Sequence, residues 1–309
     1  MISAPAKVIL FGEHAVVYGQ PAIAAPVSSL RARSAIQSRT EGEGLRLIVT
    51  SNGQQLAVEI DPEDVNSAFS AAVRLVLRHL KVSVPPSVNI TLESDIPVAS
   101  GLGSGAAITT VLAQAVATAV GQKLDAVDLN QIVFEVEKIY HGTPSGIDNT
   151  VIVYEKPVYY VRNHPLELLT IPQPIILIVA DTGVSASTKI AVGDVRYLYE
   201  REPERIQVIL SSIGAVVQQA RTAIENGDIE ALGPLMVQNH AMLRTLTVSS
   251  PELEALVDAA MNAGALGAKL SGGGRGGNMI ALVTPETAEI VQQALREAGA
   301  TRALMTTIG

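Results

Sequence analysis

A glycine-rich segment in the first half of the chain constrains the fold more than any other feature. Gly101, Gly103 and Gly105 supply three glycines in five residues, and an alanine-rich run typical of a helix begins at Ala106. Glycine adopts positive φ angles and lets the backbone approach a ligand without a Cβ clash. The free N–H groups at the start of the following helix favour an anion of phosphate size. The segment therefore predicts either an anion-binding loop or a tight turn at a helix start.

The spacing of this segment excludes two common nucleotide-binding motifs. No Gly-Lys-Ser or Gly-Lys-Thr follows the glycines, so the segment is not a Walker P-loop. It is not a dinucleotide fingerprint either, because no acidic residue lies about 20 positions later on a second strand. The segment indicates a different phosphate-binding class, if it binds phosphate at all.

A second glycine run lies near the end of the chain. Residues 272–277 contain five glycines in six positions, interrupted by Arg275, and an apolar strand is expected over Asn278–Val283. So many glycines are costly in chain entropy, which indicates that the bare backbone is needed there. Close approach to another loop and close approach to a phosphate are the two alternatives.

Two carboxylates and a lysine are candidates for chemistry. Glu137 lies near the end of a helix expected over about Asp125–Tyr140, and Asp148 is expected in the loop that follows. Two such carboxylates suit a magnesium ligand and a proton acceptor. The alternative is that Glu137 lies on a solvated helix face and that Asp148 caps a turn. Lys7 begins an apolar strand that ends in Gly-Glu-His, where His14 could equally be structural.

Composition excludes several classes of function. The net charge is −8 without any cluster of Lys and Arg, which argues against nucleic-acid binding. The chain has no Cys, so disulfides, thiolate nucleophiles and Cys-based zinc sites are excluded. The longest apolar helical run, Ala106–Val120, is too short and too polar for a membrane span. The beginning of the chain does not read as a signal peptide, so a cytoplasmic protein that does not interact with membranes is expected.

The order of predicted elements mixes strand pairs with runs of helices, which indicates an α+β fold. Apolar periodicity predicts a helix over Asn66–Lys81 and a doubly buried strand over Ile175–Ala180. Thr150–Tyr154 is expected to be a strand. Three prolines between Asn163 and Pro174 suggest a boundary, so we expect one domain over residues 1–168 and a second over 169–309.

Four segments in this order resemble the GHMP kinase superfamily, a group of small-molecule kinases, over the whole chain. They are the opening Pro-Ala-Lys-Val-Ile-Leu-Phe-Gly-Glu-His, the segment Pro97–Ala107, the stretch Glu137–Asp148 and the segment Lys269–Gly277. The resemblance implies a two-domain α+β fold. Its N-terminal ATP-binding domain would be ribosomal-protein-S5-like, its C-terminal domain an α/β plait, and its active site would lie in the cleft between them.

The segments Ala4–Gly19 and His141–Asn149 take the form found in superfamily members that phosphorylate mevalonate. The resemblance implies ATP-dependent phosphorylation of the C5 hydroxyl of mevalonate to 5-phosphomevalonate in isoprenoid biosynthesis, with Mg²⁺ as cofactor. ATP and mevalonate are the expected partners, and a homodimer is a candidate assembly. Two alternatives stay open: a kinase of the superfamily that acts on phosphomevalonate, homoserine or a sugar, and a non-catalytic sensor of the same fold.

The resemblance also assigns roles to individual positions. It implies that Asp148 is the catalytic carboxylate, that Lys7 contacts this aspartate and the substrate hydroxyl, and that Glu137 and Ser104 hold the metal. The ATP-binding loop would be Pro97, Val98, Ala99, Ser100, Gly101, Leu102, Gly103, Ser104, Gly105, Ala106 and Ala107. Substrate-binding positions would be Glu13, His14, Ser145, Gly146, Thr188 and Arg196. The loop of the final motif would be Ser271, Gly272, Gly273 and Gly274.

Two positions depart from the superfamily pattern. Gly105 stands where a second serine, often a metal ligand, is usual, so Ser104 or water would replace it. Arg275 interrupts the final glycine run, where it could contact ATP or point to solvent.

Overall fold

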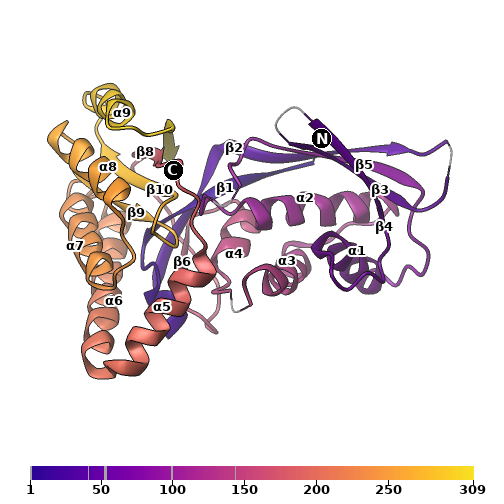
Figure 1. Ribbon diagram of the computed structural model, residues 1–309, viewed down its shortest axis with the longest axis horizontal. Coiled ribbons are helices and arrows are strands. Elements are labelled where there is room, and N and C mark those ends of the chain that lie inside the picture. The colour runs from indigo at the N-terminus through magenta and orange to yellow at the C-terminus, as the bar shows by residue number, and fades with distance from the viewer. Residues whose placement is uncertain (1, 41, 52–53, 99, 143) are drawn as a thin grey trace. The chain divides into compact units, whose positions relative to one another are not determined.

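The computed structural model describes residues 2–40, 42–51, 54–98, 100–142 and 144–309 (Figure 1). The chain forms two compact units. One comprises Met1–Ala6, Ser28–Pro97 and Gly103–Glu155, and the other comprises Lys7–Val27, Val98–Leu102 and Lys156–Gly309. Strands β1 (Ile2–Phe11) and β2 (Ala22–Ser38) contribute residues to both units. The domain boundary expected after residue 168 stays a prediction.

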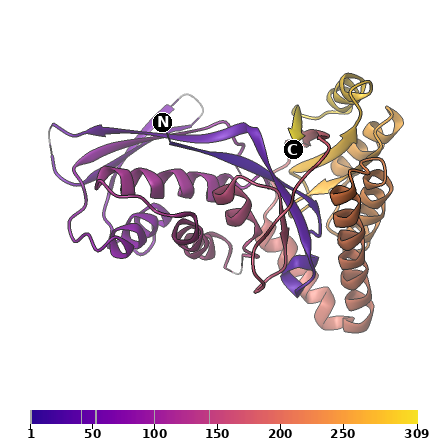
Figure 2. The ribbon, with the colours of Figure 1, turned by 180° about the vertical axis from the view of Figure 1, so that it is seen from behind.

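The first unit combines a mixed sheet with helices along one side of it (Figures 1 and 2). Its strands follow the order β4, β3, β5, β2. Strand β3 pairs with β5 in parallel, whereas the β3–β4 and β2–β5 pairs are antiparallel. The bounds are β3 Leu45–Ser51, β4 Gln54–Ile60, β5 Val88–Ser94, α1 Ala68–His79, α2 Ser104–Ala119, α3 Ala126–His141 and α4 Ile147–Tyr154.

Helix α2 is the centre of this unit. It contacts strand β5, and the helices α1, α3 and α4 pack around it. Most of its side chains are buried and many of them are alanines, which let the neighbouring helices approach closely. The hydroxyl of Ser34 on β2 donates to the carbonyl of Val111 at 3.2 Å, so the helix is also attached to the sheet through a buried hydrogen bond.

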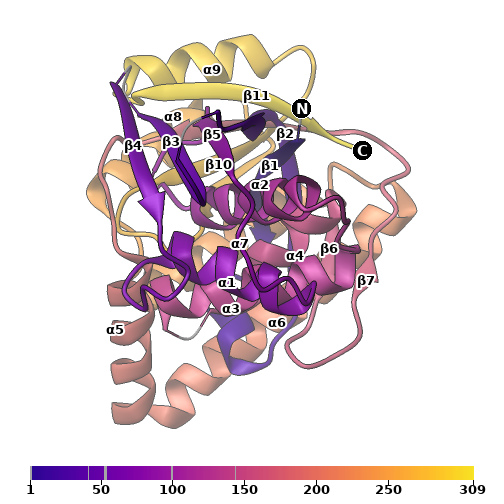
Figure 3. The ribbon, with the colours of Figure 1, turned by 90° about the vertical axis from the view of Figure 1, so that its right-hand side faces the viewer.

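The second unit contains an antiparallel four-stranded sheet in the order β11, β8, β10, β9. Helices α7 and α8 contact β9, and α9 runs beside β11 (Figure 3). The apolar strand expected over Ile175–Ala180 is β8, an inner strand of this sheet. The bounds are β8 Ile175–Asp181, α5 Thr188–Arg201, α6 Pro203–Asn226, α7 Leu232–Thr245, α8 Pro251–Asn262, β9 Gly267–Ser271, β10 Asn278–Val283, α9 Ala288–Glu297 and β11 Arg302–Ile308.

The same unit includes the second half of β1, from Lys7 onward, and the first part of β2. A short 3-10 helix, η1 (Ala15–Tyr18), joins these two strands. Residues Ala22–Ala24 of β2 pair with β6 (Val158–Tyr160), which in turn pairs with β7 (Glu167–Leu168). Both termini of η1 lie next to residues with positive φ, His14 and Gly19.

The structure corrects one predicted element and adds others. Thr150–Tyr154 belongs to helix α4 and is not a strand, and Asp148 lies in the first turn of this helix and not in a loop. The β-branched side chains of this stretch favour a strand locally, but packing of α4 on α2 and α3 overrides that preference. Helix α5 and strand β9 were not expected. Only Ala191 and Val195 are buried on α5, so its apolar periodicity is weak.

The core is aliphatic, as a chain with three Phe and no Trp requires. Within the described ranges, none of the helices combines the length and the apolar content that crossing a bilayer requires. Two lysines, Lys7 and Lys269, are among the largest fully buried side chains. Lys is almost never fully buried without a partner, so each of these lysines is expected to lie in a network of polar contacts.

The contact between α7 and β9 generates a stability prediction. A Cβ at Gly267 would lie 2.6 Å from the Cα of Gly233, so Gly267→Ala should force the helix away from the strand. We expect the free energy of unfolding to fall by about 1–3 kcal/mol, the usual cost of overpacking. Chemical denaturation of the purified variant measures this change.

Gly193→Ala is the matched control for this prediction. Gly193 is a helical position on α5, and a Cβ there meets nothing within 4 Å. Alanine should therefore raise the free energy of unfolding by up to about 1 kcal/mol through helix propensity. Equal effects of the two substitutions would contradict the packing account.

Candidate functional site

The first glycine segment leads into the start of α2. Gly103 is the N-cap residue with φ 77°, and no side chain among the described residues caps this helix start. The first N–H groups of α2 are therefore left to solvent or a ligand, which is the arrangement that binds phosphate. The described members of the predicted ATP-binding segment are Pro97, Val98, Ser100, Gly101, Leu102, Gly103, Ser104, Gly105, Ala106 and Ala107, whereas Ala99 lies outside the described residues.

Glu137 on α3 faces this helix start. A Cβ added at Gly105 would lie 3.2 Å from Oε1 of Glu137, so the carboxylate occupies the space beside the first turn of α2. A side chain at position 105 would require the carboxylate to move by a few tenths of an ångström. The described residues hold no group of three or more His, Asp or Glu that could bind a metal by themselves. One carboxylate, a serine hydroxyl and substrate phosphates nevertheless match the ligands that Mg²⁺ prefers.

Asp148 is held by the packing of α4 on α3. The side-chain amide of Asn149 donates to Oδ1 of Asn130 on α3 at 2.7 Å, and the hydroxyl of Thr150 donates to the carbonyl of Gly146 at 2.6 Å. Gly146, the N-cap residue of α4, has φ 93°, a conformation that L side chains rarely adopt. The half-buried Asp148 therefore projects from a helix turn fixed to the helix that carries Glu137.

Lys7 is buried in β1 of the second unit. Its N–H donates to the carbonyl of Leu102 at 3.0 Å, which attaches the strand to the first glycine segment. The strand itself is longer than predicted, since it begins at Ile2. Lys7 thus lies on a rigid strand and not on a loop, which suits a residue that must hold one position.

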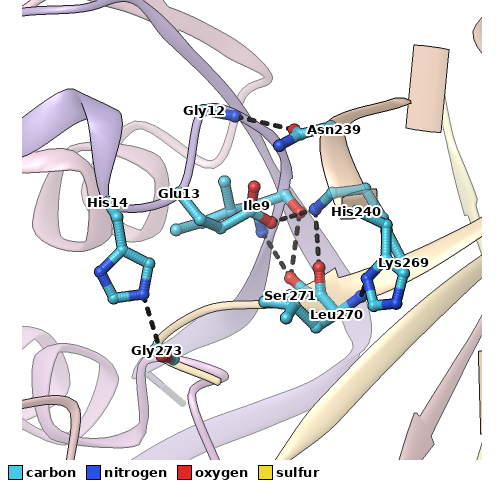
Figure 4. Close-up of polar contacts among 10 residues, drawn as sticks. All are labelled: Ile9, Gly12, Glu13, His14, Asn239, His240, Lys269, Leu270, Ser271 and Gly273. Carbon is cyan, nitrogen blue, oxygen red and sulfur yellow. Dashed lines mark hydrogen bonds and ion pairs between the residues drawn. The ribbon is translucent and has the colours of Figure 1, made fainter. Parts of the chain in front are cut away.

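The final motif packs against the backbone of the first two motifs. The hydroxyl of Ser271 accepts from the N–H of Ile9 and donates to its carbonyl, both at 3.0 Å (Figure 4). A Cβ at Gly272 would lie 3.5 Å from the carbonyl oxygen of Gly101, and one at Gly277 would lie 2.7 Å from that of Ser100. Of the two roles considered for this glycine run, close approach to another loop is confirmed.

A second buried hydrogen bond joins the same segments. The side-chain amide of Asn278, at the start of β10, donates to the carbonyl of Ser100 at 2.5 Å. Loss of either the glycines or this amide would separate the backbone of the final motif from the first glycine segment. Both observations favour a role for residues 271–278 in supporting the first glycine segment. Neither the glycines nor the amide of Asn278 needs a contact with phosphate to be explained.

Glu13 and His14 also contact this part of the chain. Oε1 of Glu13 pairs with the ammonium of Lys269 on β9, and both side chains are 0% exposed (Figure 4). Burial raises the pKa of Glu13 and lowers the pKa of Lys269, while the charge of each partner opposes the shift of the other. Such a pair is stable only with close geometry and further hydrogen bonds.

His14 has a defined tautomer. Its Nε2 lies 2.9 Å from the carbonyl oxygen of Gly273, which can only accept, so Nε2 carries the proton and Nδ1 is left as an acceptor. Burial lowers the pKa of His14 to about 4, against the raising effect of this hydrogen bond. The imidazole is therefore neutral at physiological pH.

Helix α5 contributes the two remaining predicted substrate positions. Thr188 is its first residue, and a Cβ at Gly273 would lie 2.8 Å from the Thr188 hydroxyl oxygen, so the helix start packs on the final glycine loop. Arg196 is exposed, and its charge lowers the pKa of Tyr18, which burial raises more strongly. The structure thus places His14, Thr188 and the loop Gly272–Gly274 together.

Arg275 makes contacts that neither of the two alternatives included, and its contact with ATP stays a prediction. Its guanidinium pairs with Asp194 on α5 and donates to the carbonyl of Thr247 at 3.3 Å. Sequence reasoning also missed Lys269, Asn239 and His240, which surround Glu13 and β9. A lysine inside an otherwise apolar stretch before the glycine run was the one available signal for Lys269.

Known proteins match this chain over nearly all of its length. Residues 67–156 match the family GHMP kinases N terminal domain, and residues 220–301 match GHMP kinases C terminal. The mevalonate kinase of Thermococcus sibiricus is 38% identical over 97% of this chain and 93% of its own, and that of Pyrococcus furiosus is 39% identical with the same coverage.

The fold agrees with this similarity. The crystal structure of L. major mevalonate kinase in complex with R-mevalonate superposes with a TM-score of 0.85 and 31% identity, covering 99% of this chain and 94% of that one. The two-domain α+β fold implied by the sequence is thereby confirmed. The chain belongs to the GHMP kinase superfamily and, within it, to the mevalonate kinases.

Proposed function

We propose that the protein transfers the γ-phosphoryl group of ATP to the C5 hydroxyl of mevalonate and so forms 5-phosphomevalonate for isoprenoid biosynthesis. The observation that carries this proposal is the similarity to curated mevalonate kinases at 38–39% identity over 97% of the chain. The geometry within each unit supports it, because the uncapped start of α2 and the adjacent Glu137 suit a nucleotide triphosphate with its metal.

Phosphoryl transfer depends mainly on positioning and charge stabilisation. The uncapped N–H groups at the start of α2 would bind the β- and γ-phosphates, and Glu137, beside that helix start, would hold Mg²⁺ together with Ser104. The chemistry that Mg²⁺ would supply there is neutralisation of the negative charge on the phosphates. Asp148 accepts the proton of the C5 hydroxyl, and Lys7 stabilises the negative charge that forms on the substrate oxygen.

The remaining assignments concern substrate binding. Arg196 pairs with the carboxylate of mevalonate, since a guanidinium binds a carboxylate in a bidentate manner. Glu13, His14, Ser145, Gly146 and Thr188 complete the site for mevalonate. The division of the chain into domains over residues 1–168 and 169–309, the cytoplasmic location and the homodimer are further parts of this proposal.

A substrate panel tests the proposed function. Purified protein with MgATP is offered mevalonate, phosphomevalonate, homoserine and galactose, and release of ADP is recorded. We expect the highest kcat/KM with mevalonate. Faster turnover of another alcohol would assign the chain to a different small-molecule kinase, and no turnover of any would favour the sensor.

Asp148→Asn tests the proton acceptor. The substitution keeps the shape of the side chain but removes its basicity, so kcat should fall by at least about 10²-fold with a modest change in KM. Asp128→Asn is the matched control, because Asp128 is likewise in the first turn of a helix in the first unit, yet faces His79. Turnover of Asp148→Asn near that of Asp128→Asn would remove Asp148 from the mechanism.

Arg196→Ala tests the carboxylate contact. Loss of a charge-assisted hydrogen bond of about 1.5–3 kcal/mol should raise the KM for mevalonate by roughly 10-fold or more, with kcat less affected. Arg201→Ala, in the last turn of the same helix, is the control and should leave KM unchanged. An unaltered KM in Arg196→Ala would exclude this residue from the substrate site.

A further inference from the structure

Lys269 has no part in the mechanism described above, although it pairs with Glu13, one of the proposed substrate positions. Both side chains are 0% exposed, and Lys269 also donates to the carbonyl of Leu270 at 2.7 Å. Removing two charges from water is costly, and apolar residues of similar volume often stabilise a fold as well as a buried ion pair does. Stability alone therefore does not explain why strand β9 carries a lysine here.

The backbone beside Glu13 adopts an unusual conformation. His14 has φ 60° and ψ −45°, and the N–H of Ala15 donates to the carbonyl of Glu13 at 2.6 Å. A hydrogen bond between residues i and i+2 around a positive φ defines a strained γ-turn. Such strain at a residue with a side chain persists only where the surroundings enforce it, and it is found mostly at functional sites.

Three contacts from other elements hold this turn (Figure 4). Asn239 on α7 accepts the N–H of Gly12 through Oδ1 at 3.3 Å, the carbonyl of Gly273 accepts from His14, and Lys269 pairs with Glu13. Among the described residues, Oε2 of Glu13 has no hydrogen-bond partner. The carboxylate is therefore held mainly through Oε1, which makes Lys269 its principal anchor.

The position of Lys269 connects the turn to the final glycine loop. Lys269 is the middle residue of β9. The strand ends two positions later at Ser271, and the loop Gly272–Gly274 follows directly. His240 supports this strand from α7 by accepting the N–H of Leu270 through Nδ1 at 3.3 Å. The ammonium of Lys269 thus adds a buried ion pair to the hydrogen bond of His14 with Gly273, and together they join the γ-turn to the strand that leads into the loop.

We propose that Lys269 is a positioning residue of the mevalonate site. By pairing with Glu13 it holds the strained γ-turn in the conformation that places the His14 imidazole against Gly273, beside Thr188. This inference rests on the proposed function, and it assigns a role to a residue that the mechanism does not use directly.

Two variants separate positioning from stability. Lys269→Met leaves Glu13 buried without its partner, so both the melting temperature and the activity should fall. The double variant Glu13→Met with Lys269→Met removes both charges and should recover the melting temperature. We expect kcat/KM for mevalonate to stay at least about 10-fold below wild type in both, because small misplacements of binding groups are costly in rate.

Leu295→Ala is the control for stability. Leu295 is buried on α9, which packs on β8 and β11, and its truncation should lower the melting temperature without changing kcat/KM. All rates are measured well below the melting temperature of each variant. A wild-type kcat/KM in either Lys269 variant would overturn the inference.

The remaining outcomes are also decisive. Failure of the double variant to fold would overturn the inference as well, since the pair would then serve stability. If the wild-type protein ignores mevalonate but phosphorylates another alcohol, the proposed substrate is wrong, and the same comparison of variants is made with that alcohol. An error in the substrate is thereby distinguished from an error about Lys269.

Discussion

The reciprocal hydrogen bonds between Ser271 and Ile9 are the interaction on which the rest of the second unit depends. One buried hydroxyl satisfies both backbone groups of a residue 262 positions away in the chain. Buried backbone groups without partners are costly, so this contact strongly favours one register between β1 and the end of β9. Lys7 and Glu13 lie on the same segment as Ile9, and their positions follow from that register.

The close packing of the final motif on the first glycine segment accounts for the glycines near the end of the chain. Gly272 and Gly277 let the final motif lie against the carbonyls of Gly101 and Ser100, at distances where side chains would collide or crowd. The final motif is therefore the scaffold that carries the opening strand and the first glycine segment. In the first unit, α2 has the corresponding role, because α3 with Glu137 and α4 with Asp148 both pack on it.

Much of this could be predicted from local sequence signals, and the exceptions have physical reasons. The glycine segments, the apolar strand β8 and the alanine-rich helix α2 follow from backbone freedom and periodicity, and they appear as expected. Helix α4 was missed because its β-branched residues favour a strand until tertiary packing intervenes. The pairs Glu13–Lys269 and Arg275–Asp194 join residues far apart in sequence, and a spacing pattern carries no information about such contacts.

The central claim is that phosphate is transferred from ATP to one particular oxygen of mevalonate. Phosphorus NMR of the product, coupled to proton detection, tests this claim most directly. We predict a phosphomonoester signal coupled to the methylene protons at C5, which appears together with ADP in equal amounts. A phosphoester without methylene coupling, as expected for the tertiary hydroxyl at C3, or free phosphate as the sole product would contradict the account.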